Sequence, residues 1–266
     1  MKLNKLVVAM MVAAAGFVSA GAQATVVNVG GVQWDNAFLN DFSSKSNLFE
    51  ITSGTAGANL NGYGFINQIN GKNYGTTNTF LASPYELTYE FGGFTLTTAS
   101  TISGFGTGIE SNGTFTATGG WLKVYLDNAT TFDETNKSTA TNGTLWLGLQ
   151  ASSAFYGSGI TLKGSITGQN SVGLSGQGVG YFDVIQNALN GGLAWSYLDT
   201  NSEPGGADFT YTSEFQGLNN AYPEANAQGN NTIFGKTAPV PEPGSIALVG
   251  LGLLGLCFGR RNKKAS

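Results

Sequence analysis

The side chains that could carry out chemistry in this sequence are almost entirely carboxylates. The 266 residues include no histidine, and Cys257 is the only cysteine, which excludes Ser-His and Cys-His catalysis and removes the usual zinc ligand. Glycoside hydrolysis needs two carboxylates at a fixed separation. The carboxylates considered for such a pair are Glu86, Glu90, Glu110, Asp183 and Asp208. None stands in a recognisable acid/base context, so the sequence predicts a protein that is not an enzyme and has no cofactor.

One short segment is rich in the oxygen ligands that calcium prefers. Asp127, Asp133 and Glu134 lie close together, with Asn128 and Asn136 among them, and such side chains bind Ca²⁺ in proteins. The spacing lacks the glycine and the final glutamate of an EF-hand loop. A solvated acidic turn is therefore the preferred interpretation, with a calcium site as a weak alternative and no other metal expected.

Aromatic side chains suggest contact with carbohydrate. In residues 122–126 and 145–149, leucines alternate with other residues, so Trp121, Tyr125 and Trp146 fall out of phase with the leucines. If the leucines face the core, these three rings face outward, where exposed aromatic surface is typical of a binding site. Burial of both faces between two sheets is the alternative for the tryptophans. The first interpretation gives a lectin-like surface module.

The elements that would position these side chains are expected to be strands. Period-two alternation favours strands at residues 87–91, 94–97, 122–126, 145–149 and 209–215. The Gly92-Gly93 step predicts a hairpin between the first two, and residues 181–190 fit either a short helix or part of a strand pair. Eight to twelve strands are expected, and hence an all-β fold with a single sandwich- or barrel-like antiparallel domain.

Periodicity indicates the extent of the exported domain, and charge indicates the character of its surface. The expected domain covers residues 25–218, and residues 219–238 lose periodicity and are expected to form a flexible spacer. Residues 25–238 contain six basic and fifteen acidic residues, a net charge of −9. Such an acidic surface argues against nucleic acid as a partner and is compatible with neutral or cation-bridged polysaccharide.

The N-terminus has the pattern of a secretory signal peptide. Lys2 and Lys5 precede an apolar stretch, and Ala22 and Ala24 form an A-x-A cleavage site. Residues 1–24 are therefore expected to be removed by signal peptidase after engaging the secretion machinery. The mature chain then begins at Thr25.

The C-terminus combines prolines, an apolar run and a basic end. Pro241 and Pro243 restrict the backbone of residues 240–243, which include Val240 and Glu242. This segment is therefore expected to be extended and accessible. The uncharged run of 13 residues that follows predicts a short transmembrane helix with a cytoplasmic basic end; a buried core helix is the alternative. The predicted helix includes Ile246, Leu251, Leu254 and Phe258, and the basic end consists of Arg260, Arg261, Lys263 and Lys264.

Residues 239–266 resemble a PEP-CTERM sorting segment, because Pro-Glu-Pro, an apolar helix and arginines follow one another in order. The resemblance implies a Gram-negative bacterium and processing by an exosortase. The protein would be anchored transiently in the inner membrane before it reaches the cell surface or the extracellular matrix. The extension after Arg261 is longer than usual for the family.

A second resemblance covers most of residues 34–216. The chain is similar to the flocculation-associated PEP-CTERM proteins of floc-forming bacteria. The motifs that carry this similarity are FGGF at 91–94, GGWLKVYLD at 119–127, NGTLWL at 142–147, GGLA at 191–194, YLDTN at 197–201 and GADF at 206–209. The resemblance implies an extracellular matrix protein that supports aggregation, flocculation and biofilm together with exopolysaccharide. A lectin-like module is the first alternative, and a carboxylate-dependent glycoside hydrolase is the weaker one.

Overall fold

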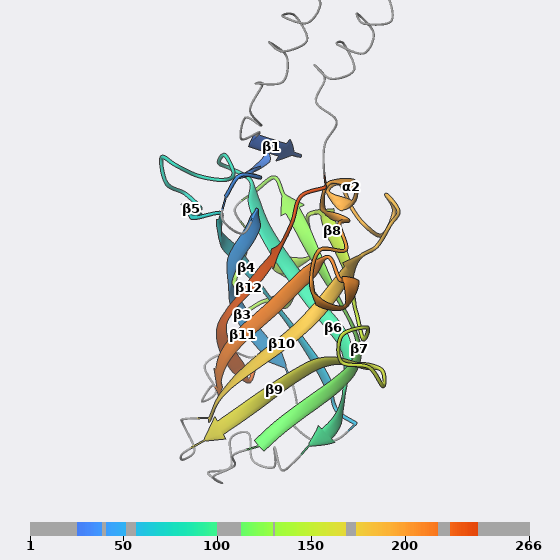
Figure 1. The fold of residues 1–266 in the computed structure, drawn as a ribbon. Helices are drawn as coiled ribbons and strands as arrows, with labels where there is room; N and C mark the ends of the chain where they lie inside the picture. Colours follow the sequence, from blue (N-terminus) through green and yellow to red (C-terminus); the bar gives the residue numbers. More distant parts are fainter. Residues whose placement is uncertain are drawn as a thin grey trace, which may run out of the picture.

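The folded body of the chain is an antiparallel β-barrel (Figure 1). The computed structural model describes residues 26–38, 41–51, 57–99, 113–129, 131–168, 174–217 and 224–238. Eight strands follow one another around the barrel in the order β12-β11-β10-β8-β7-β6-β4-β3. The expected all-β class is confirmed, and of the two architectures left open the barrel is the one observed.

Most barrel strands pair with the strand that precedes or follows them in the sequence. The strands are β1 (Val26–Val29), β2 (Val32–Asp35), β3 (Phe42–Ile51), β4 (Asn59–Ile69), β5 (Lys72–Asn73), β6 (Glu86–Ala99), β7 (Gly113–Asp127), β8 (Thr144–Ala151), β9 (Ile160–Gly168), β10 (Leu174–Val184), β11 (Phe209–Gly217) and β12 (Ala227–Gly235). The described helices are single turns, namely η1 (Lys137–Ala140), α2 (Trp195–Leu198) and η2 (Pro204–Gly206). No helix in the described part of the chain is long and apolar enough to cross a membrane.

The barrel closes between β3 and β12, which lie side by side. At one end the backbone N–H of Asn226 donates to the carbonyl of Glu50 over 2.9 Å. At the other end Asp41 forms a bridge with Gly235. Contact between β3 and β12 covers the two edges of the sheet, which is the advantage of a barrel over an open sheet.

The expected flexible spacer is therefore wrong for much of its length, because β12 lies within residues 219–238. β12 pairs with β11 along its whole length, from Ala227 opposite Gly217 to Gly235 opposite Phe209. Apolar alternation did not reveal this strand because its inward positions include Gly229 and Asn231 as well as Ile233.

One position in the barrel is filled by two strands, β8 and β9. Both are antiparallel to β7 and to β10: β8 pairs with one half of each and β9 with the other half. The two strands run in the same direction, so they amount to a single strand interrupted by residues 152–159. This excursion projects from the outer wall and is visible at the lower right of Figure 1.

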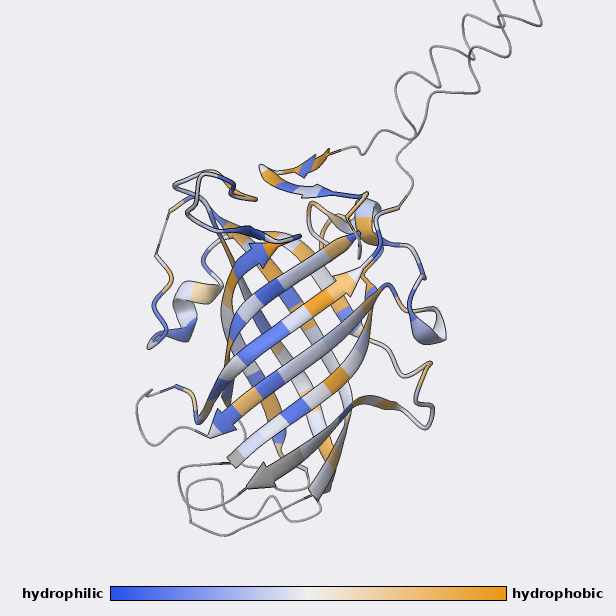
Figure 2. Ribbon diagram, turned by 60° about the vertical axis from the view of Figure 1, so that its left-hand side comes forward, coloured by the Kyte–Doolittle hydropathy of each residue, from blue (hydrophilic) through white to orange (hydrophobic). Residues whose placement is uncertain are grey.

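Side chains fill the interior of the barrel. Leu87, Leu122 and Phe182 are among those that are almost completely buried, and the cavity between Leu122, Phe182 and their neighbours has a volume of only about 10 Å³. Blue and orange alternate along many strands in Figure 2, as expected when successive side chains point to opposite faces. An eight-stranded barrel is just wide enough for side chains to fill it.

A hairpin of β1 and β2 covers one end of the barrel (Figure 2). Trp34 of this hairpin is fully buried and packs edge-on against Phe42 and Trp146. Its indole Nε1 donates to Thr237 Oγ1 over 2.8 Å, and the Thr237 hydroxyl donates to Asp41 Oδ1 over 2.6 Å. The two ends of the described chain are thus fastened to the same end of the barrel.

The structure differs from the expected hairpin at Gly92-Gly93 and shows which of the two interpretations of residues 181–190 applies. Gly92-Gly93 does not form a hairpin: β6 continues through it, and Gly92 opposite Trp121 and Phe94 opposite Gly119 keep the same partner strand on both sides. Gly93 has a φ of 71°, so the strand can bend there without reversing. Residues 181–184 end β10, and residues 185–190 contain no helix.

Candidate functional site

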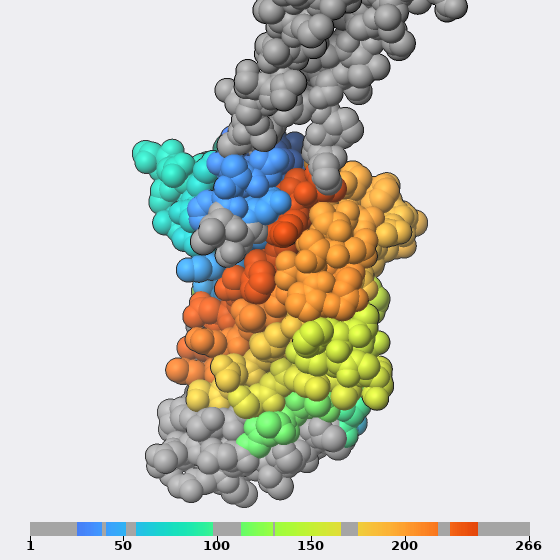
Figure 3. Space-filling view, in the orientation of Figure 1, coloured from blue at the N-terminus to red at the C-terminus, as the bar shows by residue number. Residues whose placement is uncertain are grey.

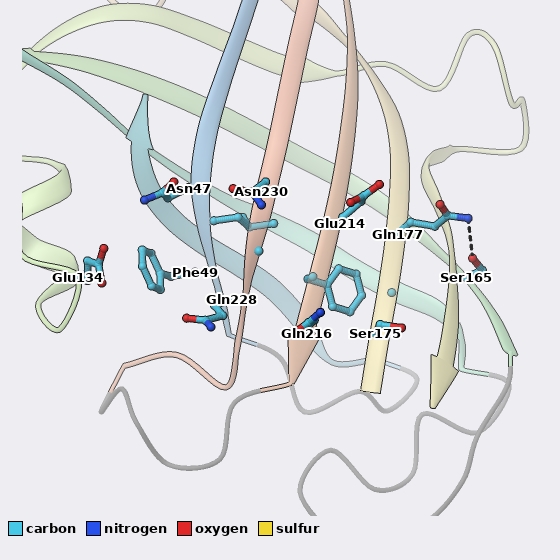
Figure 4. Close-up of a pocket in the computed structure, with 14 residues that line it drawn as sticks. Asn47, Phe49, Glu134, Ser165, Ser175, Gln177, Glu214, Gln216, Gln228 and Asn230 are labelled. Atoms are coloured by element: carbon cyan, nitrogen blue, oxygen red, sulfur yellow. Dashed lines mark hydrogen bonds between the residues drawn. The ribbon is translucent and has the colours of Figure 1, made fainter. Parts of the chain in front are cut away.

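A polar groove lies on the outer wall of the barrel (Figure 4). Its volume is about 860 Å³, and β3, β9, β10, β11 and β12 contribute to its lining together with Glu134. The lining residues are Asn47, Leu48, Phe49, Glu134, Ser165, Ser175, Gly176, Gln177, Glu214, Phe215, Gln216, Gln228, Gly229 and Asn230. Amide, hydroxyl and carboxylate groups therefore dominate its surface.

Strand register arranges the polar side chains of the groove in rows. Gln177 lies opposite Ser165 on β9 and opposite Glu214 on β11, and Glu214 lies opposite Asn230 on β12. The Gln177 amide donates to the Ser165 hydroxyl over 3.3 Å (Figure 4). A second row, two residues further along the strands, contains Ser175, Gln216 and Gln228. Strands about 4.8 Å apart and rows about 7 Å apart make a regular grid of donors and acceptors.

Alternation of buried and exposed residues keeps these rows in the solvent. On β11, Glu214 and Gln216 are exposed while Ser213 and Phe215 are buried. The ring of Phe215 lies over Gly176 of β10, where a Cβ atom would come within 2.2 Å of the ring. Glycine therefore lets the inner side chains pack closely, and the outer face of the same strands is left to polar groups.

Residues 131–142 form the side of the groove that carries Glu134. Phe132 packs against Phe49 and Tyr63 on the outer face of the barrel, with ring centroids 6.4 and 6.5 Å apart. The Tyr63 hydroxyl donates to the carbonyl of Glu134 over 2.8 Å, and Lys137 forms an ion pair with Glu90 at 2.7 Å. These contacts fix the segment against β3, β4 and β6.

The groove carries negative charge. Glu134 and Glu214 are among its lining residues, and no lysine or arginine of the described chain is. Coulomb attraction therefore favours neutral or cationic ligands over polyanions. The grid could hold a hydroxyl-rich chain, since Asn and Gln side chains both donate and accept hydrogen bonds.

The aromatic residues expected to contact carbohydrate do not line this groove. Trp121 and Tyr125 are half-buried on β7, a strand that contributes nothing to the described lining. Lys123 Nζ lies 5.1 Å from the centroid of the Trp121 ring. Burial, followed by the charge of Glu90, raises the pKa of Tyr125. Contact with carbohydrate at Trp121 and Tyr125 stays a prediction.

The expectation that Trp146 faces outward is wrong, because Trp146 lies in the core with 1% of its surface exposed. Leu145 and Leu147 pair with the consecutive residues Tyr125 and Val124, so Trp146 is the extra residue of a β-bulge. A bulge lets two neighbouring side chains point to the same side, which defeats the alternation argument. The indole Nε1 donates to the carbonyl of Val29 over 2.9 Å.

Replacing Trp146 should therefore lower stability. We expect Trp146→Ala to reduce the free energy of unfolding by about 3–5 kcal/mol, the usual cost of truncating a buried large aromatic side chain. Trp121→Ala, at a half-buried site, serves as the comparison and should cost less. Urea denaturation followed by circular dichroism measures both, and equal small losses would contradict the assignment of Trp146 to the core.

The acidic segment is occupied by internal hydrogen bonds. Asp127 Oδ2 accepts from the Thr131 hydroxyl over 3.0 Å. Asp133 Oδ1 accepts from the backbone N–H and the hydroxyl of Thr135, which lower the pKa of this carboxyl. Among the described residues no group of three or more acidic, cysteine or histidine side chains could hold a metal ion. Asp127, Asp133 and Glu134 therefore do not converge on a calcium site in this structure.

Four of the carboxylates considered for hydrolysis lie within the described residues. Burial raises the pKa of Asp183, a hydrogen bond with Ser152 lowers it, and the charges of Asp208 and Asp199 raise it. Asp208 is buried, and its oxygens accept backbone N–H bonds from Val184, Thr200 and Asn201 at 2.5–2.7 Å. Glu86 Oε1 accepts from the backbone N–H groups of Thr131 and Phe132 at 2.8 Å. These carboxylates fasten loops to the barrel. Glu90 pairs with Lys137, and Glu110 lies outside the described residues.

Comparison with known proteins decides the identity of the C-terminal segment. Residues 239–264 match the PEP-CTERM protein-sorting motif. The motif marks the chain as an exported protein that exosortase processes and that is sorted to the cell surface. Neither a curated protein nor a solved structure matches the chain.

The terminal signals themselves lie outside the described residues. This holds for the predicted signal cleavage site at Ala22, Ala24 and Thr25 and for the whole PEP-CTERM segment, including its predicted membrane helix.

The polar groove was not predicted from the sequence, because it depends on register between distant strands. Its sequence signal is weak: Gly176, Gly178 and Gly180 alternate with the outward residues of β10.

Proposed function

We propose that this exported protein is a non-catalytic component of the extracellular matrix that supports flocculation and biofilm by binding exopolysaccharide in the polar groove. The observation that carries the proposal is the in-register row of Ser165, Gln177, Glu214 and Asn230 across four strands. Delivery to the cell surface by the PEP-CTERM segment brings the groove to the polymer.

The chemistry of the groove suits a polysaccharide better than other polymers. Sugar hydroxyls both donate and accept hydrogen bonds, and so do the amides of Gln177 and Asn230. Nucleic acids and other polyanions would meet Glu134 and Glu214 without a compensating cation in the described lining. The rows form an open grid and not a deep enclosed pocket, which suits a chain more than a single small molecule.

The groove is tested by removing two amides that share a row. We expect Gln177→Ala combined with Asn230→Ala to raise the dissociation constant for isolated exopolysaccharide about tenfold. Each lost hydrogen bond costs about 0.5–1.5 kcal/mol, and 1.4 kcal/mol corresponds to a factor of ten. Isothermal titration calorimetry measures the binding, and Gln33→Ala, which removes an exposed amide of β2, is the matched control.

The cellular role is tested by restoring the gene to a deletion strain. The intact protein should restore flocculation, and the double variant should do so poorly at equal secretion. Normal flocs in the deletion strain would overturn the matrix role. Release of reducing sugar ends from the polymer by the purified protein would instead favour a glycoside hydrolase. Saturable binding that one monosaccharide abolishes would favour the lectin-like alternative.

A further inference from the structure

The excursion between β8 and β9 contributes Phe155 and Tyr156 to a cluster of three aromatic rings, and Tyr181 of β10 is the third. The ring centroids are 5.2 Å apart for Phe155 and Tyr156, 4.7 Å for Phe155 and Tyr181, and 5.5 Å for Tyr156 and Tyr181. Phe155 leaves 50% of its surface exposed, whereas Tyr181 beneath it leaves 8%. We call these three residues the aromatic platform.

Backbone contacts hold the platform in place. The N–H of Gly157 donates to the carbonyl of Ser153 over 2.8 Å, and the N–H of Ser152 donates to the carbonyl of Tyr181 over 2.7 Å. The Tyr156 hydroxyl donates to the carbonyl of Val179 over 3.1 Å. Gly205 lies so close that a Cβ atom there would be 2.7 Å from the Phe155 nitrogen. The exposed ring therefore rests on a supported base.

Polar and charged groups border the platform. Lys163 Nζ lies 4.5 Å from the centroid of the Tyr156 ring, and Glu203, whose charge acts on Tyr181, accepts a hydrogen bond from the Thr210 hydroxyl over 2.7 Å. An apolar ring with hydrogen-bonding groups at its edge is typical of sites for ligands that are themselves part apolar and part polar. A sugar ring, with its C–H face and its hydroxyl rim, has this character.

The platform continues the grid of the polar groove. Lys163, Val179 and Thr212 form the row next to that of Ser165, Gln177 and Glu214, because the register of β9, β10 and β11 is unbroken there. Tyr181 lies one row further along β10 and four residues from Gln177, or about 13 Å along the strand. In Figure 3 the yellow-green surface of the excursion lies beside the yellow surface of β9 and β10.

We propose that Phe155, supported by Tyr156 and Tyr181, is a stacking subsite for one sugar ring of the polysaccharide chain that occupies the polar groove. The inference rests on the proposed function and adds a specificity element to it. The exposed ring covers the C–H face of the sugar, while the bordering polar groups meet its hydroxyls. A chain bound at both places lies along β10.

Substitutions of Phe155 separate ring stacking from simple hydrophobic contact. We expect Phe155→Ala to raise the dissociation constant for isolated exopolysaccharide about three- to tenfold, the range of one aromatic contact. Phe155→Tyr should bind like the unaltered protein, whereas Phe155→Leu should be as weak as Phe155→Ala. Leu189→Ala, at a side chain with 85% exposure, is the matched control, and all variants should keep the same melting temperature.

A fluorescent variant reports contact directly. Phe155→Trp should change its emission when the polysaccharide is added and saturate at the concentration that saturates calorimetry. Unchanged affinity in Phe155→Ala, or full affinity in Phe155→Leu, overturns the subsite while leaving the groove intact. No binding by the unaltered protein overturns the proposed function itself. Phe155-dependent binding to lipid vesicles but not to the polysaccharide would assign the ring to a membrane surface instead.

Discussion

A chain that comprises residues 25–218 will not fold, whereas residues 25–238 will form the complete barrel. The shorter chain lacks β12, which closes the barrel between β3 and β11. Its loss exposes two sheet edges and the inward side chains that Ile233 contacts, and burial of such a side chain alone contributes about 1.5–3 kcal/mol. Against a typical stability of about 5–15 kcal/mol, these losses abolish cooperative folding.

Thermal denaturation of the two chains checks this result. The longer chain should show a single cooperative transition and a strand-rich circular dichroism spectrum, and the shorter one should aggregate or show no transition. Ile233→Asp in the longer chain keeps the length but buries a charge, so it should also be strongly destabilised. A shorter chain that unfolds cooperatively would return residues 219–238 to the role of a spacer.

β12 shows why the sequence predicted the individual strands better than the closure of the sheet into a barrel. Residues 122–126 and 209–215 place apolar side chains on one face, and both lie in strands as expected. β12 faces the interior with Gly229 and Asn231. Because the first is small and the second is polar, the sequence of β12 shows no alternation of apolar residues. The choice between a barrel and a sandwich depended on that strand.

The site was harder to predict than the fold for two physical reasons. A single bulge moved Trp146 from the expected surface into the core, and bulges leave little trace in residue type. The groove depends on pairing between strands that are far apart in sequence, as when Ser165 and Asn230 join one row. The terminal PEP-CTERM segment was readable because its signal is contiguous and needs no tertiary structure.

A buried glutamate makes the stability of the barrel depend on pH. Glu50 points into the interior beside Phe91, Phe182 and Tyr211, and burial raises its pKa from 4.5 to about 8. Between these values the folded protein holds a proton that the unfolded chain releases. The free energy of unfolding therefore falls as pH rises from about 4.5 to about 8 and then levels off.

We expect Glu50→Gln to remove this fall and to stabilise the protein most at alkaline pH. The raised pKa corresponds to a cost of roughly 5 kcal/mol for the ionised form, at about 1.4 kcal/mol for each pH unit. Glutamine keeps the shape and the polar character of the protonated acid but cannot ionise. Urea denaturation of both proteins at pH 5, 7 and 9 measures the difference, which should be small at pH 5 and largest at pH 9.

The comparison isolates Glu50 from the other carboxyls. Burial also raises the pKa of Glu86 and of Asp183, so both add to the same trend, but they are present in both proteins and cancel in the difference. Tyr89 and Tyr211 face Glu50, and burial raises the pKa of each above its ordinary value, so neither ionises in this range. Parallel pH profiles for the two proteins would mean that Glu50 is ionised and compensated inside the barrel.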